Sequence, residues 1–185
     1  CAGICNKNFG LIYSCESEIY RGDGVDMLMA AGMCIFNNGS IVGCSFKGEL
    51  AANNNRGVAG IAYYNNEPNG LISDCVNYGQ MEIFLNDEGD AWWVGAGGIC
   101  QSNSGWIQRC VNKGTIIAAN GDNSVSAGGI VSGNDGTIID CYNFGEITTS
   151  NNSTSAQAVG VGGIAGGGYL GSIRNAFSLK NITVN

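Results

Sequence analysis

Apolar residues occur along this chain in short runs of four to six, and Gly and Asn separate one run from the next. β-Branched residues dominate the runs, while Gly and Asn tolerate the positive φ angles that tight turns require. The pattern predicts alternating strands and turns and not helix. In the middle of the chain it predicts strands over Gly97–Gln101, Trp106–Val111 and Thr115–Ala119.

The apolar runs belong to an internal repeat with two anchors. The first anchor is the Ile or Met of a Gly-Ile step, which recurs at intervals of 29, 28, 38, 31 and 34 residues. The second anchor is a cysteine, which Asn-x-Gly follows in three copies, at Asn77, Asn112 and Asn143. The first anchors are Ile4, Met33, Ile61, Ile99, Ile130 and Ile164, and the second are Cys15, Cys44, Cys75, Cys110 and Cys141, with Asn175 in the last copy. Such self-similarity is the signature of stacked repeat architectures.

Strands this short are stable only if successive copies pair with one another at about 4.8 Å and bury a common interior. We therefore expect an all-β, right-handed, three-sided parallel β-solenoid of about six coils, since parallel crossovers are almost always right-handed. The whole chain, 1–185, would form a single domain, with coils starting near residues 2, 31, 59, 97, 128 and 162. An antiparallel barrel or a propeller with three-stranded blades is the alternative.

The expected interior consists of columns of equivalent residues. These columns are the two anchor sets, the set from Ile12 to Ile173, and Leu50, Met81, Ile116 and Ile147. Immediately before the cysteine anchor, successive copies carry Asp74, Arg109, Asp140 and Arg174. In a stacked structure these charges would lie about 5 Å apart with alternating sign, which relieves the repulsion between identical stacked charges.

The nine cysteines allow two interpretations. Cys5, Cys34 and Cys100 each precede a cysteine anchor by ten residues, so disulfides Cys5–Cys15, Cys34–Cys44 and Cys100–Cys110 are conceivable. Other copies carry Ala62, Val131 and Ala165 at the same place, which marks a site for a small buried apolar group, and a free thiol behaves as such a group. We favour free buried thiols. Neither Cys-x-x-Cys nor histidine occurs, so we expect no metal site and no cofactor.

Composition limits the classes of partner. Gly accounts for 31 of 185 residues and Pro for one, while 44% of residues are hydrophobic, which favours a packed interior over a disordered tract. The net charge of −7 argues against nucleic acid and anionic lipid as partners. No apolar stretch reaches the ~18 residues of a membrane span. The chain opens within a repeat at Cys1, and neither end offers a cap, so we expect a segment cut from a longer array or, less favoured, a subunit that stacks head to tail into a fibre.

The segment Gly162-Gly163-Ile164-Ala165-Gly166 and the phrase Gly-x-Ile-x-x-Cys-x-Asn-x-Gly resemble GLUG-motif repeats. Such repeats occur in large surface or secreted bacterial proteins, including stretches of immunoglobulin-A-cleaving metallopeptidases. The resemblance implies a non-enzymatic structural or adhesive module at the cell surface or outside the cell, with neighbouring repeats or copies of itself as partners. It does not imply the peptidase, because His-Glu-x-x-His is impossible in a chain without histidine.

The longest insertion, residues 85–94, suggests a second function. Its members Asp87, Glu88, Asp90, Trp92 and Trp93 could stack a sugar ring and bind its hydroxyls, so the possible partners include a glycan or a host surface protein. The simpler interpretation is a loop whose aromatic residues fold back over the solenoid. Carbohydrate cleavage needs two carboxylates across a cleft. Asp74 and Asp140 would instead lie two coils apart with Arg109 between them, so we expect no enzyme.

Overall fold

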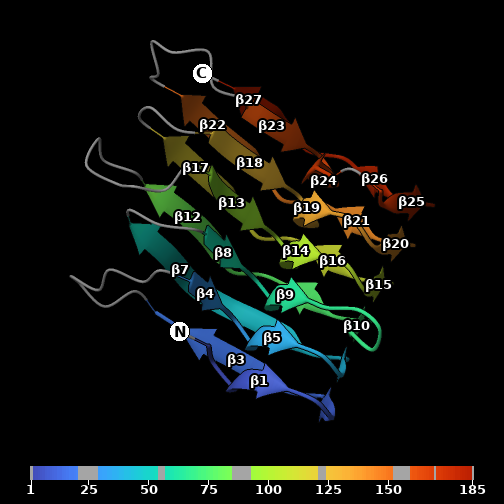
Figure 1. Cartoon of the computed structure of the whole chain (residues 1–185). Helices are drawn as coiled ribbons and strands as arrows, with labels where there is room; N and C mark the ends of the chain where they lie inside the picture. Colours follow the sequence, from blue (N-terminus) through green and yellow to red (C-terminus); the bar gives the residue numbers. More distant parts are fainter. Residues whose placement is uncertain are drawn as a thin grey trace.

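The computed structural model describes residues 2–20, 29–53, 57–84, 93–120, 124–151, 159–168 and 170–184. These residues form 27 strands joined by turns and bends, with no helix among them. Every strand pairing is parallel and joins one repeat to the next (Figure 1). The predicted all-β parallel solenoid is therefore confirmed.

Strands from successive repeats form parallel sheets, which we name A to E in the order in which each repeat reaches them. Sheet A contains β4 (Met29–Ala31), β8 (Gly57–Ala59), β13 (Trp93–Gly97), β18 (Ser124–Gly128) and β23 (Val159–Gly162). Sheet B contains β1 (Cys5–Asn8), β5 (Cys34–Asn37), β9 (Ala62–Asn65), β14 (Cys100–Asn103), β19 (Val131–Asn134) and β24 (Ala165–Gly167). Sheet C contains β2 (Leu11–Tyr13), β6 (Ser40–Val42), β10 (Leu71–Ser73), β15 (Trp106–Gln108), β20 (Thr137–Ile139) and β25 (Ser172–Arg174).

The long strand β7 (Ser45–Asn53) belongs to both remaining sheets and joins them into one of ten strands. Sheet D contains β3 (Glu16–Ile19), β7, β11 (Val76–Asn77), β16 (Val111–Asn112), β21 (Tyr142–Asn143) and β26 (Phe177–Ser178). Sheet E contains β7, β12 (Gln80–Phe84), β17 (Ile116–Asn120), β22 (Ile147–Asn151) and β27 (Ile182–Val184).

A complete repeat thus carries five strands where the sequence pattern predicted three. Between residues 93 and 120 the strands are β13 to β17. The predicted strand 97–101 is divided by a bend at Gly98, where the chain passes from sheet A to sheet B. The predicted strand 106–111 is divided at Arg109, whose φ of 51° is left-handed and turns the chain from sheet C to sheet D. Corners that occupy a single residue leave little trace in the apolar pattern.

The predicted columns lie in the interior. Met33, Ile61, Ile99 and Ile130 are fully buried, as are Ile41, Ile72, Ile107 and Ile138, while Leu50, Met81, Ile116 and Ile147 are at most 1% exposed. Members of the same columns at the two ends of the stack lack a coil on one side, so Ile4 is 45% exposed and Ile173 47%. Burial is therefore weaker at the ends of the stack, although Ile12 in the first coil is only 8% exposed.

The predicted alignment of the last repeat is wrong by one residue. Ile173 pairs with Ile138 and Arg174 with Ile139, so Ala176, not Asn175, follows Cys141 in the column of the second anchor. Asn175, with φ of 49°, takes the left-handed corner that Asp140 and Arg109 occupy below it. Arg174 therefore lies within β25 and does not extend the column of alternating charges. The asparagine was mistaken for an anchor because small Ala176 replaces the cysteine.

Two ladders of buried asparagines run along the solenoid, one within sheet B and one within sheet D. In each step the side-chain Nδ2 of one repeat donates to the Oδ1 of the next, at 2.7 or 2.8 Å. The first ladder is Asn8, Asn37, Asn65, Asn103 and Asn134, and the second is Asn77, Asn112 and Asn143, ending on the Ser178 hydroxyl. Buried amides need such partners, because an unpaired polar group is costly in an apolar interior.

The ladders explain the glycines of the repeat. A Cβ added to Gly98 would lie 2.4 Å from Cγ of Asn112, and one added to Gly129 would lie 2.4 Å from Cγ of Asn143. The Gly-Ile step therefore lies directly against the second ladder across the interior. In the Asn-x-Gly phrase, a Cβ on Gly114 would lie 1.8 Å from the carbonyl oxygen of Gly79 in the preceding repeat. At these positions the spacing between neighbouring segments leaves no room for any side chain.

Gly39→Ala should destabilise the protein by about 1–3 kcal/mol, because the new Cβ would overpack a closed contact. That Cβ would lie 2.3 Å from the carbonyl oxygen of Gly10 in the repeat below. Gly10→Ala is the matched control: it occupies the same column with no coil beneath it, and its Cβ would meet nothing within 4 Å. Urea denaturation midpoints measure both. Equal destabilisation by the two substitutions would contradict the stacking.

Asn112→Ala should lower the unfolding free energy by an amount on the order of 3 kcal/mol, because it leaves several buried polar groups without hydrogen-bond partners. It removes the bonds from Asn77 and to Asn143, as well as the bond that the Gly114 amide donates to Asn112 Oδ1. Asn69→Ala, at an exposed turn, should leave the unfolding free energy almost unchanged. Chemical denaturation followed by circular dichroism checks both, and a near-neutral Asn112→Ala would show that the ladder is dispensable.

Candidate functional site

We use the name outer groove for the surface where the outward faces of sheets A and B meet. This surface is hollowed at both ends, while Gly57, Gly95 and Gln101 between the two hollows are buried. Val125 and Ala127 of β18 point into the main core, so Ser126 between them faces outward. On sheet B, Cys34 and Ala62 belong to the main core, and the residue after each of them faces outward. These residues, Ile35 and Tyr63, form a second apolar cluster with Ala31. We define the outer groove by three columns: Met29, Gly57, Gly95, Ser126 and Gly160; Ile35, Tyr63, Gln101, Ser132 and Gly166; Phe36, Tyr64, Ser102, Gly133 and Gly167.

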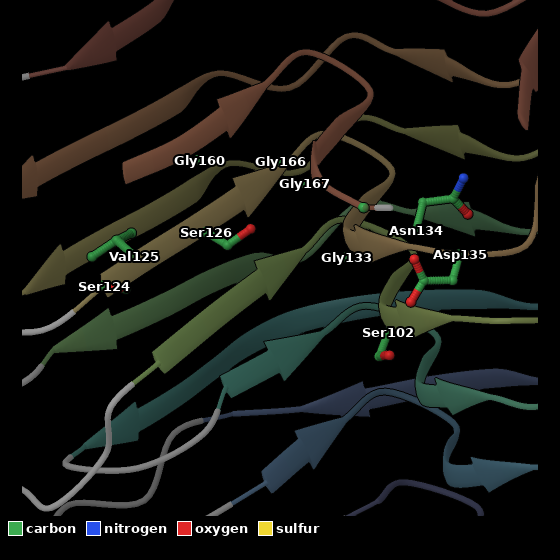
Figure 2. Close-up of a pocket in the computed structure, with 11 residues that line it drawn as sticks. Ser102, Ser124, Val125, Ser126, Gly133, Asn134, Asp135, Gly160, Gly166 and Gly167 are labelled. Carbon is green, nitrogen blue, oxygen red and sulfur yellow. The ribbon is translucent and has the colours of Figure 1, made fainter. Parts of the chain in front are cut away.

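The C-terminal half of the outer groove is a hollow of about 580 Å³, lined mainly by serine and glycine residues (Figure 2). Figure 2 shows Ser126 on one side of this hollow and Asn134, Asp135 and Ser102 on the other. The Ser126 hydroxyl donates to the Ser132 carbonyl, and the Ser132 hydroxyl donates to the Ser126 carbonyl, each at 3.0 Å. These reciprocal bonds fix the two sheets to each other at this point.

The N-terminal half of the outer groove is aromatic. The rings of Phe36 and Tyr64 stack with centroids 5.3 Å apart and planes 19° apart, and Tyr63 meets Tyr64 edge-on at 4.7 Å. With Met29 and Asn66, the stacked pair lines a shallower hollow of about 380 Å³. The Asn66 Nδ2 donates to Asn38 Oδ1 at 3.2 Å, which orients the amide at its rim.

Gln101 lies between the two halves. It is 1% exposed, and its Nε2 has no hydrogen-bond partner in the described part of the chain. Its column places it between Tyr63 and Ser132. A buried amide without a partner costs free energy. Because Gln101 lines neither hollow, it is not placed to bind a ligand in either of them.

The predicted ligand-binding loop lies largely outside the described residues. This holds for Asp87, Glu88, Asp90 and Trp92, while Trp93 is described only as the backbone start of β13. The proposal of a glycan site on loop 85–94 therefore stays a prediction.

The cysteines of the second anchor form a column at the corner between sheets C and D. Cys44, Cys75, Cys110 and Cys141 are buried and Cys15, at the end of the stack, is half-buried. Each thiol donates to the carbonyl two residues before it, as Cys75 does to Ser73 at 3.2 Å. All eight described cysteines are free, so the disulfides Cys5–Cys15, Cys34–Cys44 and Cys100–Cys110 do not form. Cys5, Cys34 and Cys100 instead start strands of sheet B, at a different corner from their supposed partners.

Burial raises the pKa of three of these thiols. Desolvation raises the pKa of Cys100 to about 12 and raises the pKa of Cys110 well above its ordinary value. Desolvation, followed by the hydrogen bond with Cys5, also raises the pKa of Cys34 to about 12; the two sulfur atoms are 3.6 Å apart. Since the thiolate is the reactive form, Cys34, Cys100 and Cys110 are suited to packing and not to chemistry. Hydrogen bonds with Cys110 lower the pKa of Cys75 to about 4 and also lower the pKa of Cys141, but both of these side chains are fully buried.

Asp74 and Arg109 form the ion pair that the column of alternating charges predicted. Arg109 Nε lies 2.7 Å from Asp74 Oδ1, and Nη2 lies 2.8 Å from Oδ2 and from the Ser73 hydroxyl. The hydrogen bond from Arg109 lowers the pKa of the Asp74 carboxyl. Both side chains are about half exposed, so this pair contributes little to stability. A carboxyl whose pKa is lowered in this way stays ionised, and it is therefore poorly suited to acid–base catalysis.

In the described ranges, no three acidic, cysteine or histidine side chains converge as a metal site would require. Nor does any helix there have the length and apolar character that would carry it across a bilayer. Comparisons of the chain with protein-family models, with curated proteins and with solved structures give no match. Functional inference therefore rests on the residues themselves.

Sequence reasoning missed the outer groove and the first asparagine ladder. A signal for the ladder exists: Asn-x-Gly also occurs before sheet C, at Asn8, Asn37, Asn103 and Asn134, and an insertion between Asn65 and Gly70 hides the fifth copy. For the groove, the adjacent large residues Ile35-Phe36 and Tyr63-Tyr64 break the alternation expected of a strand with one buried face. They mark a place where both faces are covered.

Thiol labelling tests the buried columns. In the native protein Ellman's reagent should leave Cys34, Cys44, Cys75, Cys100, Cys110 and Cys141 unmodified, because all six are buried, and should react with them after guanidinium denaturation. Cys15→Ser should remove a thiol that reacts in the native state. Rapid labelling of these six cysteines in the native protein would contradict the packing. So would their failure to react in denatured protein that has never been exposed to reductant.

Proposed function

We propose that this chain is a non-enzymatic structural module of a bacterial cell-surface or secreted repeat array, in which further coils continue the stack at its open ends. The observation that supports this most directly is the contrast within single columns. Ile138 is fully buried but Ile173 above it is 47% exposed, and Ile147 is 1% exposed but Ile182 above it is 42% exposed. A further coil would bury each terminal residue as its neighbours are buried.

The strand edges support the same proposal. β1 and β2 each pair with one strand only, and β24 and β25 at the other end do likewise. An open parallel edge offers unpaired amide and carbonyl groups in register for another strand. Additional coils, from the same chain or from a second copy, supply such strands.

Charge at the two ends favours head-to-tail continuation. The described residues of the last repeat carry Arg174 and Lys180 and no acidic residue, while those of the first repeat carry Glu16 and Glu18 with Lys7. Stacking the first repeat of one unit on the last repeat of another brings opposite net charges together. Complementary charge of this kind directs orientation more than it adds affinity.

Three features of the residues support a non-enzymatic role. The chain has no histidine, its described thiols are largely buried, and Asp74 is paired with Arg109. The resemblance of the repeat to GLUG motifs adds the extracellular or surface setting. A structural role needs no catalytic residues and requires only that the coils stack stably.

Sedimentation velocity over a rising concentration series tests head-to-tail stacking, with electron microscopy of the largest species. Ile173→Arg should abolish growth, because it places a charge on the end of a core column. Trp106→Arg is the matched control: Trp106 is 50% exposed but lies on the flank of sheet C, so growth should persist. Circular dichroism verifies that both variants fold. A wild-type chain that stays monomeric at every concentration would contradict self-stacking, as would growth that Ile173→Arg leaves intact.

A further inference from the structure

We propose that Cys5 and Cys34 are an oxidation site, at which a small disulfide such as oxidised glutathione converts the two thiols into a bond between neighbouring coils. The bond ties β1 to β5 at the end of the stack that bears the N-terminus (Figure 1). It differs from the pairings Cys5–Cys15 and Cys34–Cys44, each of which lies within one coil. This inference goes beyond the structural role and does not depend on it.

The two sulfur atoms face each other across the first two coils. Cys5 Sγ donates to Cys34 Sγ at 3.6 Å, and the two residues are direct partners in the parallel pairing of β1 with β5. Neighbouring strands lie about 4.8 Å apart, and disulfides join Cα atoms that are about 4.4–6.8 Å apart. The backbone therefore already allows the bond, and the sulfur atoms have only to approach each other to about 2.05 Å.

Within this column of sheet B, Cys5 and Cys34 are the neighbouring cysteines. The partner of Cys34 on its other side is Ala62, and the next cysteine, Cys100, lies between Ala62 and Val131. No other cysteine therefore adjoins Cys100 in the column. This makes Cys100 an internal control for the pair.

Access distinguishes this pair from the remaining buried thiols. Cys5 is half-buried at the open end of the stack, whereas Cys34 is fully buried. A small disulfide can therefore reach Cys5 directly but not Cys34. The inner thiols of the other cysteine column also adjoin one another, but all of them are buried; they are Cys44, Cys75, Cys110 and Cys141.

The reaction is a thiol–disulfide exchange in two steps. In the first step Cys5 loses its proton and its sulfur attacks one sulfur of oxidised glutathione, which forms a mixed disulfide and releases one glutathione thiolate. In the second step Cys34 loses its proton and its sulfur attacks the Cys5 sulfur, which forms the bond between the coils and releases the second glutathione thiolate. The protein gives up two electrons and two protons, and one glutathione disulfide becomes two thiols.

Cys34 is inert toward reagents in solution, but its neighbour does not have to reach it through solvent. Desolvation, followed by the hydrogen bond with Cys5, raises the pKa of Cys34 to about 12. A mixed disulfide at Cys5 removes that hydrogen bond, and the short distance between the two sulfurs favours attack. Burial still keeps the thiolate scarce, so we expect closure to take on the order of hours. Without the oxidant both cysteines stay thiols.

The other cysteine pair at this end of the stack is less suited to closure. The Cys15 thiol donates to the Tyr13 carbonyl of its own coil at 3.4 Å, whereas the Cys5 thiol donates to the sulfur of the next coil. The contact from Cys15 to Cys44 is made by the Cys15 backbone amide, 3.4 Å from the Cys44 sulfur. We therefore expect the oxidant to close Cys5–Cys34 in preference to Cys15–Cys44.

The bond should oppose opening of the first coil. The amides of Ile4 and Cys5 donate to the Met33 carbonyl at 3.0 and 3.1 Å, and terminal elements open at low cost in free energy. A disulfide restricts the opened state, so hydrogen exchange of these two amides should become at least tenfold slower after oxidation. The Leu179 amide, which donates to the Asn143 carbonyl at the opposite end of the stack, should exchange at an unchanged rate.

Peptide mapping tests the bond itself. Protein carrying Cys1→Ser is held overnight in oxidised glutathione, its remaining thiols are blocked with N-ethylmaleimide under denaturing conditions, and it is digested with trypsin. The digest should contain a disulfide between peptides 1–7 and 22–47, with fragment ions that place it on Cys5 and Cys34. Cys1→Ser removes the other cysteine of peptide 1–7.

Alanine variants test the order of the two steps, and Ala62 shows that the column accommodates alanine. Cys34→Ala should retain glutathione on Cys5, because nothing displaces it. Cys5→Ala should leave Cys34 as a free thiol without glutathione. Thiols with a merely structural role would show no such asymmetry. Cys100→Ala is the matched control and should form the Cys5–Cys34 bond as fully as the wild type does.

Three results would overturn the proposal. The first is recovery of Cys5 and Cys34 as blocked thiols after overnight oxidation of the folded protein. The second is a bond from either cysteine to Cys15 or Cys44 instead. The third is glutathione on Cys34 in Cys5→Ala, which would show that Cys34 is reached from solvent. Sedimentation of the oxidised protein reports separately on head-to-tail stacking, so each proposal can fail without the other.

Discussion

The structure depends on the close stacking of each coil on the one before it. Backbone hydrogen bonds supply the general attraction between coils, but they do not distinguish one register from another. The two asparagine ladders do, because an amide that slips by one residue loses both its donor and its acceptor partner in a buried environment. A column of identical side chains is thus satisfied only when every repeat lies directly above the last, as in the amide ladders of cross-β assemblies.

That constraint accounts for most of what is conspicuous in the sequence. Glycines occur where a ladder or a carbonyl of the neighbouring coil occupies the place of a Cβ, as at Gly98 and Gly114. Cysteines fill a narrow corner where a small, apolar side chain is required, and Ala176 fills it in the last repeat. The outward columns of sheets A and B change in character from Met29 and Tyr64 to Ser126 and Gly133 along the stack.

The spacing of the anchors predicted the parallel stack and its interior columns, because repetition reports directly on which residues share an environment. It did not predict the division of each coil into five strands, since a corner such as Arg109 occupies one residue and any residue type can be forced into it. The outer groove was not predicted either, because the interrupted alternation at Ile35-Phe36 and Tyr63-Tyr64 shows that both faces are covered and does not show where a surface is hollowed. Asn175 lies at the spacing that the first anchors predict, but the last repeat has one more residue between sheets B and C, which places Ala176 in the anchor column. The loop at 85–94 remains the part of the candidate chemistry that sequence alone describes.

Exchange of the asparagine side-chain amide protons tests this account most directly, by nitrogen–proton correlation spectra recorded after transfer into deuterated water. The Nδ2 protons of Asn37, Asn65, Asn103 and Asn112 should persist long after those of the exposed Asn6 and Asn69 have vanished, because each ladder amide is buried and bonded to the next repeat. Equal and rapid loss of all these signals would show that the ladders do not hold the coils together.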